Sequence, residues 1–160
     1  MCNCNRDKKY IDIAKIWATN SHAIRSKVGA IIVKDGMIIS DGYNGTPAGF
    51  DNNCEDIIDC GHSCTNMFTE DDRCDTCKEH RLQTKKEVLH AEANAILKLA
   101  KHGGVGTDGA TLYVSLSPCF DCAKLIIQAG IKEVIYSEKY RDTSGLELLK
   151  RAGIKTKMVK

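Results

Sequence analysis

Residues 111–130 read TLYVSLSPCFDCAKLIIQAG. The first five residues of this stretch are mostly apolar or β-branched, which is typical of a buried strand. From Cys119 onward apolar residues recur at helical spacing, and Gly130 follows where such a helix would end. The stretch therefore predicts a strand that leads directly into a helix over residues 119–129, with Cys119 and Cys122 at the junction.

The flanking sequence continues this alternation of strands and helices. We predict helices over residues 8–19, 89–100 and 145–152, and strands over residues 28–33, 37–40, 133–136 and 154–159. Lys34-Asp35-Gly36 predicts a hairpin turn between the first two strands. Strands and helices that alternate in this way favour an α/β layer structure.

Length and composition favour one globular domain that spans residues 1–160. A net charge of +2 and 6% aromatic residues argue against a nucleic-acid partner. No apolar run is long enough to span a bilayer, and the N-terminus lacks the apolar centre of a signal peptide, so we expect no membrane partner and a cytoplasmic location. Residues 51–88 differ from the rest: they are polar and cysteine-rich, and we interpret them as an insertion.

Nine cysteines in a chain of this length require an explanation. A disulfide scaffold would need export, and the odd number would leave one thiol unpaired. In a reducing compartment, cysteines at short spacing are more often metal ligands. We therefore favour metal binding over disulfide bonding.

Two short motifs carry the candidate chemistry. The first is His90-Ala91-Glu92 at the start of a predicted helix, and the second is the Pro118-Cys-x-x-Cys sequence after a predicted strand. His90, Cys119 and Cys122 would give zinc three protein ligands and leave the fourth position open for water, as in catalytic sites. Glu92 would then take a proton from that water and return it to the substrate. The alternative is a structural zinc completed by another cysteine.

The pair of motifs, H-x-E followed by P-C-x-x-C, is typical of zinc deaminases that act on cytosine or adenine. The sequence resembles the deoxycytidylate (dCMP) deaminases of the cytidine deaminase-like superfamily. The matching stretches are SKVGA (26–30), GYNGTPAG (42–49), HAEANAI (90–96), SPCFDCAK (117–124) and QAGIKEVIY (128–136). This resemblance implies a three-layer α/β/α fold with a central mixed sheet of about five strands.

The resemblance also implies an activity: hydrolysis of dCMP to ammonia and dUMP, the precursor of thymidylate. Glu92 would protonate N3 of the ring and then the leaving amine. Asn44 would hold the sugar hydroxyl, the Ala91 backbone N–H would meet the base carbonyl, and Ser117 belongs to the matched site. The phosphate needs cationic or hydroxyl donors, for which the candidates are Arg25, Ser26, Lys27, Tyr140 and Arg141. Lys27 could instead be a solvated surface charge, and Tyr140 could simply pack.

Regulation and assembly are further implications of the resemblance. Many members of the family are homohexamers that dCTP activates together with Mg²⁺ and that dTTP inhibits. The candidate effector-binding residues are Gly42, Tyr43, Asn44, Gly45, Pro47 and Gly49, where glycines allow close approach of a triphosphate. The alternative interpretation is an ordinary tight loop beneath the active site.

A second zinc is indicated by spacing within residues 51–88. Cys60-x3-Cys64 and Cys74-x2-Cys77 form two pairs, close to the pattern of a four-cysteine structural zinc. Cys54, His62 and His80 are alternative ligands, and Cys2 and Cys4 are either further ligands or part of a disordered end. A segment with so little apolar surface could be ordered by metal binding.

Three other functions remain open. The first is deamination of a related pyrimidine, such as dCTP, CMP, a free nucleoside or an intermediate of riboflavin synthesis. The second is editing of nucleic acid, which the near-neutral charge disfavours. The third is a zinc-ribbon interaction module, against which the intact Glu92 argues, because a purely structural zinc has no use for that carboxylate.

Overall fold

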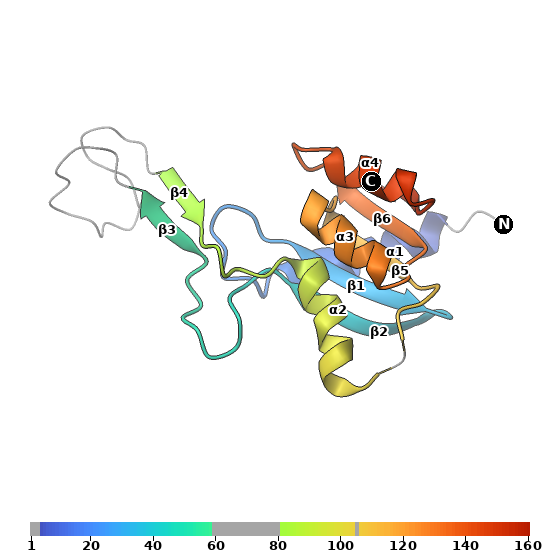
Figure 1. Cartoon of the computed structure of the whole chain (residues 1–160), viewed down its shortest axis with the longest axis horizontal. Coiled ribbons are helices and arrows are strands. Elements are labelled where there is room, and N and C mark those ends of the chain that lie inside the picture. The colour runs from blue at the N-terminus through green and yellow to red at the C-terminus, as the bar shows by residue number, and fades with distance from the viewer. Residues whose placement is uncertain (1–3, 59–80, 105) are drawn as a thin grey trace, which may run out of the picture.

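The computed structural model describes residues 4–58, 81–104 and 106–160. Its centre is a five-stranded mixed sheet in the order β2-β1-β5-β6-β7 (Figure 1). The strands are β1 (Gly29–Lys34), β2 (Met37–Tyr43), β5 (Thr111–Leu116), β6 (Glu133–Glu138) and β7 (Lys155–Met158). β1 is antiparallel to β2 and β5, whereas β5, β6 and β7 run parallel.

Helices cover both faces of this sheet, as expected for a three-layer α/β/α fold. They are α1 (Cys4–Ala18), α2 (Ala91–His102), α3 (Phe120–Gln128) and α4 (Ser144–Arg151). Because successive side chains of a strand point to opposite faces of the sheet, each strand contributes side chains to two hydrophobic cores. Ile32 and Leu112 pack in the core beneath α2, α3 and α4, whereas Ile31 and Tyr113 pack against α1. The predicted fold class is confirmed.

Two turn positions explain local features of the fold. Asp35 and Gly36 both have positive φ, 51° and 81°, which suits the two-residue hairpin turn between β1 and β2. Gly103 caps α2 in the left-handed conformation, and its N–H donates to the Leu99 carbonyl. The helix near the N-terminus begins at Cys4, earlier than the predicted residue 8, because its first turn carries polar residues that show no apolar period.

A second, two-stranded antiparallel sheet projects from the main body (Figure 1). It consists of β3 (Glu55–Ile58) and β4 (Arg81–Thr84), and Glu55 is paired with Thr84. No strand was predicted over residues 51–88, because four-residue strands are too short to give a clear alternation of apolar and polar side chains. Within the described ranges, no helix is both long and apolar enough to cross a membrane.

Candidate active site

The N-termini of α2 and α3 lie next to each other, on the side of the sheet that α2, α3 and α4 cover. His90 is the residue before the first turn of α2, and Cys119 occupies the same position in α3, each with an extended backbone. Their carbonyls accept the first helical hydrogen bonds, from Asn94 and Ala123 respectively. Backbone N–H groups at helix N-termini favour negative charge, so this position suits thiolates.

The three predicted metal ligands lie together. The Nδ1 atom of His90 is 3.4 Å from Cys119 Sγ and 3.3 Å from Cys122 Sγ. All three donor atoms lie within 4.8 Å of one another, and no other His, Cys, Asp or Glu of the described residues joins the group. An ion at ordinary Zn–N and Zn–S distances in tetrahedral geometry would separate nitrogen and sulfur by about 3.5 Å. The donor set therefore fits a zinc ion with one open position.

The protonation of the two thiols also indicates a cation site. The hydrogen bond from Cys122, and next that with His90, lowers the pKa of Cys119 to about 4. The same contact with Cys119, together with burial, raises the pKa of Cys122. The hydrogen bond with Cys119 raises the pKa of His90. The opposite directions of the two thiol pKa shifts show that a negative charge on one sulfur disfavours ionisation of the other, and a cation between them would relieve that repulsion.

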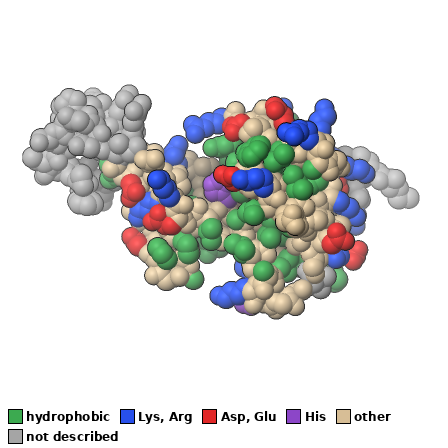
Figure 2. All heavy atoms as spheres, viewed as in Figure 1, with side chains coloured by type: hydrophobic (Ala, Val, Ile, Leu, Met, Phe, Trp, Pro, Cys, Tyr) green, Lys and Arg blue, Asp and Glu red, His purple; other side chains and the backbone are tan. Residues whose placement is uncertain are grey.

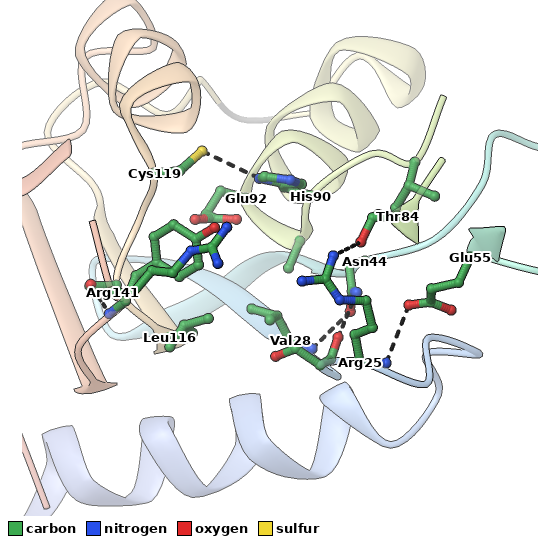
Figure 3. Close-up of a pocket in the computed structure, with 15 residues that line it drawn as sticks. Arg25, Val28, Asn44, Glu55, Thr84, His90, Glu92, Leu116, Cys119 and Arg141 are labelled. Carbon is green, nitrogen blue, oxygen red and sulfur yellow. Dashed lines mark hydrogen bonds between the residues drawn. The ribbon is translucent and has the colours of Figure 1, made fainter. Parts of the chain in front are cut away.

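Glu92 lies at the inner end of the same site. Its side chain is buried, with 4% of its surface exposed, and burial raises its pKa. Figure 3 shows its carboxylate close to the Cys119–His90 pair. A carboxyl whose pKa is raised by burial holds a proton more readily than an exposed one, which suits a general acid–base.

A cavity of about 210 Å³ opens over this group. Its lining includes Glu92, His90 and Cys119 and these predicted substrate residues: Arg25, Ser26, Asn44, Ala91, Ser117, Tyr140 and Arg141. Lys27 is exposed and does not line the cavity, and of the six predicted effector residues only Asn44 does. Arg25 and Arg141 lie on opposite sides of the cavity, which gives it two cationic walls (Figure 3).

Asn44 and Ser117 each fix a loop of the cavity wall. Asn44 Oδ1 accepts from the Val28 N–H at 2.8 Å, and its Nδ2 donates to the Ser26 carbonyl at 2.9 Å. Ser117 Oγ accepts from the Tyr140 N–H at 2.8 Å. Both side chains therefore hold neighbouring wall residues in place, whatever further contact they make with a ligand.

Five residues that line the cavity were not predicted from the sequence. They are Val28, Glu55, Thr84, Val88 and Leu116. Glu55 and Thr84 come from the β3–β4 sheet, which brings part of the predicted insertion to the cavity wall. No local signal marks them, because an acidic residue and a threonine in a polar segment are ordinary surface residues.

Two glycines allow the backbones of the site to approach closely. A Cβ on Gly42 would lie 2.3 Å from the Ala91 carbonyl oxygen, and a Cβ on Gly145 would lie 2.2 Å from the Pro118 carbonyl oxygen. Gly42, one of the predicted effector residues, thus sits in β2 directly beneath α2. Gly145 brings α4 against the segment that carries Cys119.

Gly145→Ala is expected to weaken metal binding and to lower the free energy of unfolding by about 1–3 kcal/mol, because the added methyl pushes the Pro118–Cys119 backbone away. Zinc content after dialysis and urea unfolding measure the two effects. Gly106→Ala is the matched control, since a Cβ there meets nothing within 4 Å. Equal behaviour of the two variants would contradict the positioning role of Gly145.

The ligands of the predicted second zinc belong to a part of the chain outside the described ranges. Cys60, Cys64, Cys74 and Cys77, and the alternatives His62 and His80, lie outside the described residues, as does Cys2. Cys54 is described: it is buried, and its thiol donates to the Asn52 carbonyl at 3.5 Å.

Comparisons with known proteins agree with this geometry. The family model for the cytidine and deoxycytidylate deaminase zinc-binding region matches residues 4–138. A deoxycytidylate deaminase of Enterobacteria phage T4 is 42% identical over 90% of this chain and 84% of its own length. A human deoxycytidylate deaminase is 38% identical over 84% of this chain and 66% of its own.

A solved structure extends the comparison to three dimensions. The dCMP deaminase of cyanophage S-TIM5, crystallised with dCMP and dUMP, aligns with a TM-score of 0.78 at 37% identity. The alignment covers 99% of this chain and 100% of the phage protein. The similarity therefore includes the sheet, the covering helices and the region of the cavity.

Proposed function

The chain belongs to the cytidine and deoxycytidylate deaminase family, and from this membership we propose that it hydrolyses dCMP to dUMP and ammonia. The observation that carries the proposal is the His90–Cys119–Cys122 group beside the buried Glu92. His90, Cys119 and Glu92 line one cavity with two arginines, which suits an anionic nucleotide. The zinc that this family binds supplies a Lewis acid that makes water a stronger nucleophile near neutral pH.

Glu92 carries the proton through the reaction. In the proposal its carboxylate takes a proton from the attacking water and delivers it to N3 of the ring. The C4–amine bond then breaks, and a second proton passing through Glu92 lets the amine leave as ammonia. One water is consumed for each ammonia and dUMP formed. Burial supports this role, because it raises the pKa of the carboxyl and so favours its protonated form, which can deliver a proton to the substrate.

The remaining cavity residues would orient the substrate. The N–H of Ala91 belongs to the first turn of α2, where it has no helical acceptor, so it can donate to the base carbonyl. Asn44 would contact the sugar hydroxyl, and Ser117 would hold Tyr140 against the substrate. Arg25, Ser26, Tyr140 and Arg141 would surround the phosphate. Lys27 is left out of this set because it lies outside the cavity lining.

An ultraviolet assay that offers dCMP, dCTP, deoxycytidine and CMP side by side tests the proposal. We expect the highest kcat/KM for dCMP. Faster turnover of dCTP or of the nucleoside would assign the site to another pyrimidine substrate. Absence of turnover with all four, in zinc-loaded protein, would refute the proposed function.

We further propose a second, structural zinc held by Cys60, Cys64, Cys74 and Cys77 in an insertion within one catalytic domain. The support is the spacing of the two cysteine pairs. Thiolate ligands require reduced cysteines, which is also the support for a cytoplasmic location. Elemental analysis of purified protein decides on the second ion: two zinc ions per chain support it, and one excludes it.

Effector control and assembly complete the proposal. The segment at residues 42–49, which begins in β2, would bind dCTP with Mg²⁺, or dTTP, and the support for this is the sequence resemblance. The support for a homohexamer is likewise the sequence resemblance. Exposed apolar side chains on α2 and α3, among them Leu97 and Phe120, offer a surface for subunit contact, and Figure 2 shows hydrophobic atoms on this face. A dCMP saturation curve unchanged by dCTP and Mg²⁺ would refute effector control, and light scattering gives the oligomeric state.

A further inference from the structure

The loop that precedes β1 is held by a carboxylate from the β3–β4 sheet. Glu55 Oε2 accepts from the Ile24 N–H at 3.1 Å, and Oε1 accepts from the Arg25 N–H at 3.3 Å. Only 3% of the Glu55 surface is exposed. A buried carboxylate is costly unless its oxygens are hydrogen-bonded, and two consecutive backbone donors meet that requirement.

The residue paired with Glu55 holds the other end of Arg25. Thr84, its partner across the β3–β4 sheet, accepts from Arg25 Nη1 at 3.2 Å. One pair of residues in the sheet therefore fixes both the backbone and the guanidinium of Arg25, as Figure 3 shows. Without these two contacts the long Arg25 side chain, which is exposed, would be free to turn into solvent.

The hydrogen-bond partners of Arg25 leave the positive charge of its guanidinium available to a ligand. The Glu55 carboxylate binds the backbone of Arg25, and the group that binds the guanidinium is the neutral hydroxyl of Thr84. A guanidinium has five N–H donors, so the contact with Thr84 leaves most of them for a ligand. A phosphate is the ligand that suits a planar, charged donor of this kind.

We propose that Glu55 and Thr84 are positioning residues that aim Arg25 at the substrate phosphate and so set the affinity for a nucleoside monophosphate. This inference rests on the proposed function, since it assumes that the cavity binds dCMP. It assigns to the β3–β4 sheet a part in substrate recognition. Neither residue needs to touch the substrate, because both act through Arg25.

Thr84→Val tests the proposal, because it removes the acceptor while keeping the shape of the side chain. In zinc-loaded full-length protein we expect the KM for dCMP to rise about three- to tenfold, the effect of one lost hydrogen bond, with kcat retained. Glu55→Gln is the second variant and should change KM in the same direction. Thr156→Val, on an exposed position of β7, is the matched control and should keep the parent KM.

A double-mutant cycle with Arg25→Ala separates positioning from a merely structural role. If Thr84 acts through Arg25, adding Thr84→Val to Arg25→Ala should leave KM unchanged. A further rise in KM in the double variant, a fall in kcat at constant KM, or no effect of Thr84→Val would overturn the inference. Failure of the proposed function is recognised separately, because the parent protein would then not turn over dCMP.

Discussion

Cys122→Ala is expected to abolish both catalytic zinc binding and dCMP deamination. Cys122 is buried beside His90 Nδ1, and it supplies one of only three protein ligands in the described group. Residues that merely orient a ligand are worth about 10–100-fold in metal affinity, so loss of a ligand should cost more than about 100-fold. Elemental analysis after dialysis and the ultraviolet assay measure the two losses.

Cys54→Ala is the matched control for that variant. Cys54 is also a buried free cysteine, but it lies outside the His90–Cys119–Cys122 group. Its removal should leave turnover of dCMP in place. Retention of the catalytic zinc by Cys122→Ala after dialysis would contradict the assigned ligand set. Parent-level turnover in protein that has lost this zinc would contradict the role of the metal.

Glu92→Gln should abolish turnover while zinc stays bound. Glutamine keeps the size of the side chain but cannot carry a proton, and positioned acid–base groups contribute about 10²–10⁴-fold to rate. We therefore expect kcat to fall by at least about 10²-fold, with unchanged zinc content, since Glu92 is not among the grouped donors. Glu87→Gln, an exposed residue outside the cavity lining, is the matched control. Turnover by Glu92→Gln within tenfold of the parent would contradict its role.

The sequence predicted well the features that depend on residues close together in the chain. The Asp35-Gly36 turn has its own conformational signature, and the apolar runs at residues 28–33 and 111–115 correspond to β1 and β5. His90 and Cys119 could be placed at helix starts because a helical apolar period begins at each. The metal group followed from residue chemistry and spacing, and the structure brings its three donors together.

The features that the sequence did not predict depend on contacts between distant segments. Glu55 meets residues 24 and 25 across about thirty positions of chain, and nothing near Glu55 indicates that contact. The need for glycine at position 145 could not be predicted from the sequence either. A side chain there would clash with the backbone of Pro118, which is distant in the sequence. Arg25 and Lys27 are equivalent in sequence terms, and only the path of the loop places one in the cavity wall and the other outside it.

The central claim is that this cavity uses water to replace the 4-amino group of a cytosine nucleotide. The most direct measurement is mass spectrometry of the product after zinc-loaded protein has acted on dCMP in ¹⁸O-labelled water. We predict one ammonia for each dUMP and a single ¹⁸O atom at C4 of the product. Failure of zinc-loaded protein to form dUMP, or dUMP that carries no label, would contradict the account.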